Sequence, residues 1–167
     1  LLHNEILMKY PHLIVIKSIS KSYGVPGLRL GLVATADTGL IAQLRKDVSI
    51  WNINSFAEFY MQIYSKYDND YTAACRRIAE ERDHFFRALQ PIEGLRVIPS
   101  QANYFLCEVT SGLSSAQLAD RLLRQHNILI KDCGTKSAFN GRNYIRIAVR
   151  DRADNDFLIR TLKEIIR

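Results

Sequence analysis

The chain has 167 residues and a formal net charge of +6, from 23 Lys and Arg against 17 Asp and Glu. Its hydrophobic fraction of 47% is ordinary for a globular protein and excludes a disordered chain. No apolar run approaches the roughly 20 residues that a membrane-spanning helix needs. Because the first residue is Leu rather than Met, we expect these residues to be part of a longer polypeptide.

The cysteines indicate neither a disulfide framework nor a zinc site. Cys75, Cys107 and Cys133 are far apart and odd in number, and no Cys-x-x-Cys pair occurs. The histidines also lack metal-ligand spacing to them. We therefore expect no metal, no membrane association and reduced thiols in a cytoplasmic protein.

The excess of positive charge admits a non-catalytic module that binds anions or nucleic acid. Between residues 76 and 87, however, basic side chains alternate with acidic ones, which is typical of a solvated helix face. We therefore expect no nucleic-acid partner, and a non-catalytic module that binds anions or nucleic acid stays as an alternative of another class.

The first part of the chain has the pattern of an α/β domain. An apolar run at 13–16 predicts a strand buried on both faces of a parallel sheet. The glycine-rich segment 18–31 predicts a loop, and 32–34 predicts another strand. A helix capped at residue 37 or 38 follows.

The second part predicts a compact α+β unit. A helical pattern covers 55–90, with a polar break at 68–70. The later pattern predicts strands at 95–98, 103–109, 128–130 and 144–149, a helix capped by Ser114 or Ser115, and a terminal helix. We therefore assign 1–65 to the end of a large domain and 66–167 to a small domain.

The segment 18–31 carries the residue types of a phosphate and carbonyl site. Its glycines allow the backbone to fold back, so that Lys21 and Arg29 can approach one place, with Ser18 at the start. An arginine with a nearby hydroxyl suits a phosphate, and a shielded lysine can attack a carbonyl. Taken singly, either cation is more simply a surface residue. Lys17, the nearest rival nucleophile, has the opposite strand parity from Ser18, and we interpret it as structural.

This segment resembles the cofactor-lysine motif of class I/II aminotransferases, which are pyridoxal 5'-phosphate enzymes of fold type I. The motif is small-x-small-Lys, then a glycine loop, then Gly-x-Arg-x-Gly. The resemblance implies that Lys21 forms the Schiff base with the cofactor, and that Ser18 and Arg29 bind the cofactor phosphate, with Ser20 assisting. It also implies an α/β fold class, as the C-terminal part of such an enzyme: the end of the large α/β/α domain plus the small α+β domain.

Arg146 and Lys131 are the candidate substrate-binding residues. Because Arg146 alternates with Ile145 and Ile147, the spacing equally fits an arginine on the solvent face of a strand. The resemblance implies that Arg146 grips the substrate α-carboxylate. Lys131 stands where related enzymes often have an arginine against the substrate phosphate, although an exposed lysine after the strand 128–130 is the simpler alternative. A lysine at this position keeps the positive charge of an arginine but lacks the planar guanidinium that binds a phosphate through two hydrogen bonds.

Several aromatic and amide residues have less specific interpretations. Tyr23, Asn54 and Tyr104 could line the pocket or pack at its rim. The remaining tyrosines of the helical region are better explained by packing along helices than as a stacking platform for bases: Tyr60, Tyr64, Tyr67 and Tyr71.

The resemblance is nearest to the branch of threonine-phosphate decarboxylases and histidinol-phosphate aminotransferases. The stretches that carry it are 51–54, 99–105, 128–133 and 144–150. It implies a pyridoxal phosphate enzyme acting on a small phosphorylated amino acid. We favour decarboxylation of threonine phosphate, as in cobalamin synthesis, over aminotransfer from histidinol phosphate or a related amine. We expect a homodimer for the full-length chain, and no turnover from these 167 residues alone.

Overall fold

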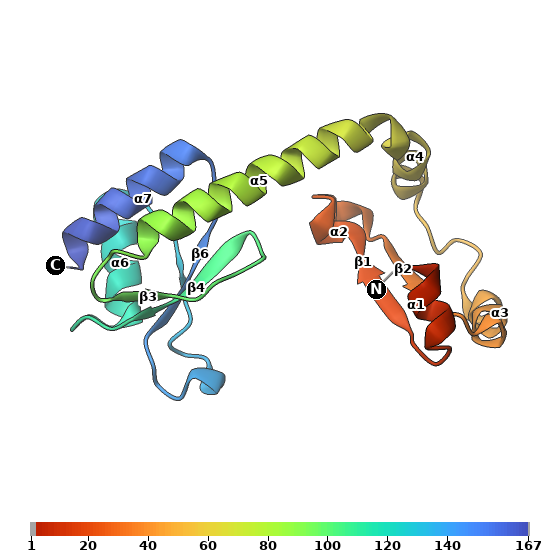
Figure 1. Ribbon diagram of the computed structural model, residues 1–167, viewed down its shortest axis with the longest axis horizontal. Coiled ribbons are helices and arrows are strands. Elements are labelled where there is room, and N and C mark those ends of the chain that lie inside the picture. The colour runs from red at the N-terminus through yellow and green to blue at the C-terminus, as the bar shows by residue number, and fades with distance from the viewer. Residues whose placement is uncertain (1–2, 167) are drawn as a thin grey trace. The chain divides into compact units, whose positions relative to one another are not determined.

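The computed structural model describes residues 3–166, and the chain forms two compact units, Leu1–Tyr71 and Thr72–Arg167 (Figure 1). The division falls inside helix α5 (Asp68–Leu89). Assignment of 1–65 to a large domain and of 66–167 to a small domain stays a prediction.

The first unit is built around a small antiparallel sheet. Strands β1 (Val15–Ser18) and β2 (Gly31–Ala34) pair with Ser18 opposite Gly31. The remaining elements are α1 (Asn4–Lys9), α2 (Ile19–Ser22), the 3-10 helix η1 (Pro26–Leu28), α3 (Thr38–Asp47), α4 (Ser55–Ile63) and the 3-10 helix η2 (Tyr64–Tyr67).

Two expectations for this unit were wrong. The strand at 13–16 begins later, at Val15, and among the described residues it pairs antiparallel rather than parallel, with Ile16 exposed. The physical reason is that the segment between the strands folds back beside β1: the Ile19 amide donates to the Leu30 carbonyl at 3.2 Å, and only the short helices α2 and η1 lie between the strands. The segment 18–31 is also not wholly loop, because α2 and η1 lie within it.

The break predicted at 68–70 lies earlier in the chain. Helix α4 tightens into η2 at Tyr64, and α5 begins at Asp68. Asp68 and Asp70 occupy the first turn of α5, where carboxylates interact favourably with the helix dipole. The polar residues therefore start a helix instead of interrupting one.

The second unit is an antiparallel sheet whose one face is covered by helices. The strands β3 (Leu95–Val97), β4 (Tyr104–Val109), β5 (Lys131–Asp132) and β6 (Tyr144–Ala148) form the order β3-β4-β6-β5. Helices α6 (Ser115–His126) and α7 (Arg152–Ile165) supply core side chains together with α5. Side chains from the helices and the sheet meet in this core, among them Phe85, Leu89, Phe105, Leu118, Ile145, Ile147 and Leu162.

Local sequence explains the helix starts of this unit. The Ser114 hydroxyl accepts from the Gln117 backbone amide at 3.1 Å, and the Ser114 backbone amide donates to the Gln117 side-chain oxygen at 2.9 Å, which completes a capping box. Asp151 caps α7 through the Asp154 amide at 2.9 Å. The strand expected at 128–130 was wrong: α6 ends in a left-handed residue, Asn127, and the ladder with β6 forms only at Lys131.

Candidate active site

The backbone around Lys21 closes into a tight loop at the end of β1. Lys21 lies in α2, a single helical turn, and α2 contacts η1. Ser18 pairs with Gly31, where an added Cβ would lie 3.3 Å from the Lys17 carbonyl oxygen. Ser18, Lys21 and Arg29 therefore lie on one closed loop, since Arg29 is two residues before Gly31. Ser20, beside Lys21, is buried.

Arg29 has a backbone conformation that is costly for an arginine. Its φ of 55° lies in the left-handed region, where a Cβ is crowded. Asn54, which lies outside the loop in the sequence, stabilises this conformation. Its side-chain amide donates to the Leu28 carbonyl at 3.0 Å, and its side-chain oxygen caps α4. Asn54, considered above as a pocket residue, thus anchors the loop.

The cations of this loop have no protein partner within the described part of the chain. The side chains of Lys21 and Arg29 are exposed, and neither makes a hydrogen bond or ion pair with a described residue. Ser18 occupies the position before α2, and its hydroxyl makes no capping bond. An ammonium, a guanidinium and a hydroxyl are therefore available to an anionic, carbonyl-bearing ligand.

In the second unit, Lys131 and Arg146 are directly opposite each other on β5 and β6. Arg146 is exposed between the buried side chains of Ile145 and Ile147, so it lies on the sheet face away from the helices. Lys131 is exposed and shares that face as the cross-strand partner. The prediction that Ile145 and Ile147 share one face of β6 and Arg146 the other is thereby confirmed. The positive side chains of Lys131 and Arg146 are therefore neighbours on the exposed face.

An aromatic side chain lies beneath Arg146. The guanidinium carbon is 5.2 Å from the centroid of the Tyr104 ring, within cation–π range. Further along the same face, Arg96 pairs with Glu108 and donates to the Tyr144 hydroxyl at 3.1 Å. That arginine is neutralised, whereas Arg146 faces no carboxylate among the residues described.

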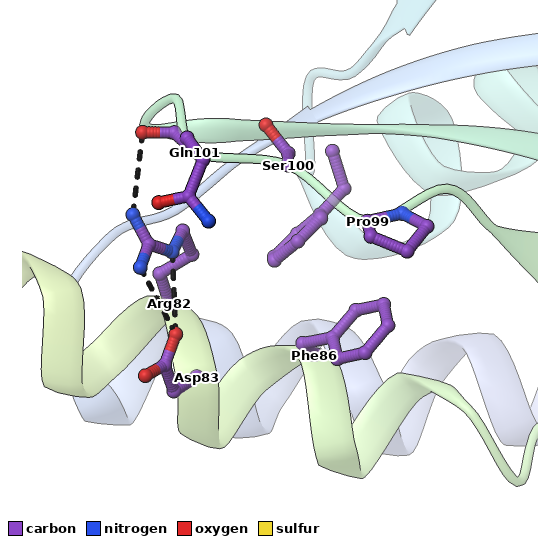
Figure 2. A pocket seen from close by; sticks show the side chains of 7 residues that line it. Arg82, Asp83, Phe86, Pro99, Ser100 and Gln101 are labelled. Atoms are coloured by element: carbon purple, nitrogen blue, oxygen red, sulfur yellow. Dashed lines mark hydrogen bonds and ion pairs between the residues drawn. The ribbon is translucent and has the colours of Figure 1, made fainter.

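A separate pocket of about 270 Å³ lies between α5 and the segment before β4 (Figure 2). Arg82 reaches from α5 to the Gln101 carbonyl at 3.2 Å and also pairs with Asp83. Phe86 stacks on Phe105 in its wall. The Arg82 guanidinium is satisfied by Asp83 and the Gln101 carbonyl, and no predicted site residue lines the pocket. We therefore interpret the contacts of Arg82 as fixing the segment that leads into β4.

The described residues contain no cluster of three or more metal-ligating side chains. No helix within 3–166 is both long and apolar enough to cross a membrane. All three cysteines are free.

Known proteins with similar sequences identify the family to which this chain belongs. The profile of the family "Aminotransferase class I and II" matches residues 5–162. The chain belongs to that family. Its relation to the threonine-phosphate decarboxylase and histidinol-phosphate aminotransferase branch, inferred from the motifs, is confirmed.

Among curated relatives, the chain is 37% identical over 160 residues to CMP-5'-(3-aminopropyl)phosphonate synthase of Streptomyces rubellomurinus, covering 96% of the chain and 26% of that protein. It is 31% identical to L-serine phosphate decarboxylase Cj1436c of Campylobacter jejuni, covering 98% and 42%. It is 32% identical to threonine-phosphate decarboxylase of Salmonella typhimurium, covering 93% and 42%. The chain thus spans less than half the length of these relatives.

Solved structures agree on the fold. A decarboxylase from Sulfurospirillum multivorans superposes with a TM-score of 0.84 at 30% identity, over 99% of this chain and 47% of that one. Histidinol-phosphate aminotransferase from Clostridium acetobutylicum gives 0.82 at 29%, over 96% and 48%. The corresponding enzyme from Sinorhizobium meliloti, solved with pyridoxal-5'-phosphate, gives 0.71 at 27%, over 98% and 43%. The fold class, fold type I, and pyridoxal phosphate as cofactor are therefore confirmed for the family.

The donor set of the first unit fits this cofactor. A lysine amine can bond to its aldehyde, and a guanidinium with a hydroxyl can hold its phosphate. The side chains of Lys21, Arg29 and Ser18 carry such groups and have no protein partner among residues 3–166, so they could hold it.

The structure also reveals contacts that the sequence analysis missed. The side chains of Tyr23, Tyr64 and Tyr71 pack together, and the Tyr71 hydroxyl donates to the Ser22 carbonyl at 3.0 Å. Spacing along a helix indicated packing for Tyr71 but gave no sign of a partner 49 residues away.

Proposed function

We propose that the protein carrying this chain is a pyridoxal phosphate-dependent decarboxylase of small amino acids that bear a phosphate group, with threonine phosphate as the favoured substrate. The observation that carries the proposal is the cation pair Lys131–Arg146, which has no carboxylate partner among residues 3–166, on a chain that also contains the Lys21 loop. A carboxylate and a phosphate on one substrate match two neighbouring cations.

The names of the relatives support the same substrate class. Enzymes named for serine phosphate and threonine phosphate are among them, and a further one is named for an aminopropyl phosphonate product. Each name joins an amine to a phosphorus group. We therefore assign a phosphorylated amino acid to this chain, and treat threonine phosphate and serine phosphate as the first substrates to test.

Each proposed residue has a distinct task. The Lys21 amine would hold the cofactor, and Arg29 and Ser18 would bind its phosphate. Arg146 would orient the α-carboxylate, and Lys131 would attract the substrate phosphate as a point charge. When bound, pyridoxal phosphate supplies an electron sink for the bond broken at Cα. The substrate amine would first displace the Lys21 amine, and the freed Lys21 ammonium would deliver a proton to Cα as CO₂ departs.

Aminotransfer is the competing reaction on the same site. It is supported by the similarity to histidinol-phosphate aminotransferases, which reaches 33% identity in the enzyme of Roseiflexus castenholzii. In that reaction Lys21 would remove the proton from Cα and deliver it to the cofactor. A substrate carboxylate, where present, would be retained.

Product analysis separates the two reactions. The protein in its full native length is incubated with threonine phosphate, serine phosphate or histidinol phosphate, with and without a keto acid. We expect CO₂ and the corresponding amine phosphate, with no need for a keto acid. Amine exchange that depends on a keto acid and releases no CO₂ would establish aminotransfer instead.

Assembly and location complete the proposal. We infer a homodimer, as the motif resemblance implies, and a cytoplasmic location, as the cysteine pattern indicates. Sedimentation of the native-length protein tests the first point, and a single species at the monomer mass would refute it.

A further inference from the structure

The single turn that carries Lys21 depends on contacts from distant parts of the first unit. Helix α2 is closed by the bond from the Tyr23 amide to the Ile19 carbonyl at 3.1 Å. An isolated turn of this length does not persist in water, because nucleation fixes several residues for one hydrogen bond. The orientation of Lys21 therefore depends on the side chains of the first unit that pack against α2.

Tyr71 supplies two of those contacts. Its hydroxyl donates to the Ser22 carbonyl at 3.0 Å, directly after Lys21 in the chain. Its ring stacks on Tyr23, with centroids 4.6 Å apart and planes at 19°. The residues on both sides of this contact belong to the same compact unit.

The Tyr23 ring is fixed from further elements. Tyr64 meets it edge-on, with centroids 5.0 Å apart at 83°. The Lys17 amine lies 5.7 Å from the Tyr23 ring centroid. Partial burial, together with interaction with Tyr23 and Asp68, raises the pKa of Tyr64 above its usual value, so this hydroxyl stays protonated.

We propose that Tyr71 is a positioning residue for Lys21, acting through the Ser22 carbonyl and the Tyr23 ring. The inference rests on the proposed function, since it assigns Tyr71 to the placement of the cofactor-binding lysine. The hydroxyl fixes the peptide that follows Lys21, and the ring stack fixes the end of the turn. Tyr71 makes no contact with substrate in this role.

The test uses Tyr71→Phe in the native-length protein, because this variant keeps the ring stack and removes only the hydroxyl. Tyr67→Phe is the matched control: Tyr67 is an exposed tyrosine in the preceding 3-10 helix. Tyr71→Leu removes the stack as well. For each protein we measure kcat, KM and the melting temperature. We also measure how the absorbance of the bound cofactor at about 420 nm depends on pH.

We expect Tyr71→Phe to lower kcat about three- to tenfold with little change in KM or melting temperature. The pH midpoint of the cofactor absorbance should shift by about half a unit, because the environment of the Lys21 nitrogen changes. Tyr71→Leu should have a larger effect in the same direction, and Tyr67→Phe should have none.

Two results would overturn the inference. If Tyr71→Phe matches Tyr67→Phe in kcat and in the absorbance titration, Tyr71 is only a packing residue. If the Tyr71 variants lose melting temperature while kcat and the pH midpoint are unchanged, its role is stability alone. Failure of the proposed function is distinguishable, because the unmodified protein would then show no cofactor absorbance that Lys21→Ala removes.

Discussion

Lys131 and Arg146 are cross-strand partners on the exposed face of the second unit's sheet. Like charges directly opposite each other in a sheet are destabilising, and no carboxylate among the described residues pairs with either side chain. A function in anion binding gives a reason for this arrangement.

The pair therefore predicts opposite effects on stability and substrate binding. Lys131→Gln should raise KM for a phosphorylated substrate by about tenfold or more, because a charge-assisted hydrogen bond is lost. The same change should leave the unfolding free energy unchanged or raised, because the repulsion disappears. Steady-state kinetics and urea unfolding measure the two effects. A stability loss with unchanged KM would contradict the anion-binding role.

The Tyr104 ring predicts a graded effect on Arg146. Tyr104→Leu removes a cation–π contact of 5.2 Å, worth about 0.5–1 kcal/mol at an exposed site, so KM should rise about two- to fivefold. Tyr104→Phe keeps the ring and should behave like the unmodified protein. Kinetics of the three proteins provide the measurement, and equal values for all of them would mean that the ring does not hold the guanidinium.

Arg29, which we propose binds the cofactor phosphate, also has a strained backbone conformation. Arg29→Gly should relieve a left-handed conformation that costs about 1–2 kcal/mol, partly offset by the greater entropy of glycine in the unfolded state. We expect unchanged or higher stability and a cofactor dissociation constant raised at least about tenfold. Arg29→Ala keeps the strain and serves as the comparison. Normal cofactor affinity in both variants would remove Arg29 from the phosphate site.

Cys107 predicts a loss of stability in alkaline solution. Burial raises the pKa of its thiol from 9.0 to about 12. Because the unfolded thiol ionises from pH 9.0 upward while the folded thiol stays protonated, the unfolding free energy should fall as the pH rises above that value. Denaturation at stepped pH checks this slope.

The control for this effect is the exposed Cys75. Cys107→Ala should flatten the alkaline slope, although it lowers stability overall through a small cavity. Cys75→Ala should leave the slope as it was. An identical slope in Cys107→Ala and the unmodified protein would assign the alkaline effect to other groups.

Local signals in the sequence were sufficient for the motif and for most helices. The spacing of Lys21, Arg29 and the glycines predicted one loop after a strand, and the Ser18–Gly31 pairing closes such a loop. The parity of Ile145 and Ile147 predicted which way Arg146 faces. These features depend on residues that are near in the sequence, so the spacing of residue types is enough to predict them.

Features that depend on distant partners were not predictable. The direction of β1 depends on which strand pairs with it, and its apolar residues fit a parallel or an antiparallel partner equally. The ladder at Lys131 begins where β6 comes within reach, three residues after the apolar run starts. The Tyr71 contact with Ser22 likewise joins positions that no spacing rule connects.

We propose that Lys21 is the lysine that bonds to pyridoxal phosphate, and labelling of this lysine tests the proposal directly. The native-length protein is loaded with the cofactor and treated with borohydride, which makes the lysine–cofactor bond permanent, and its peptides are analysed by mass spectrometry. We predict the added mass on the peptide at Lys21, and its absence in Lys21→Ala. Added mass at Lys17, or no modified lysine at all, would contradict the account.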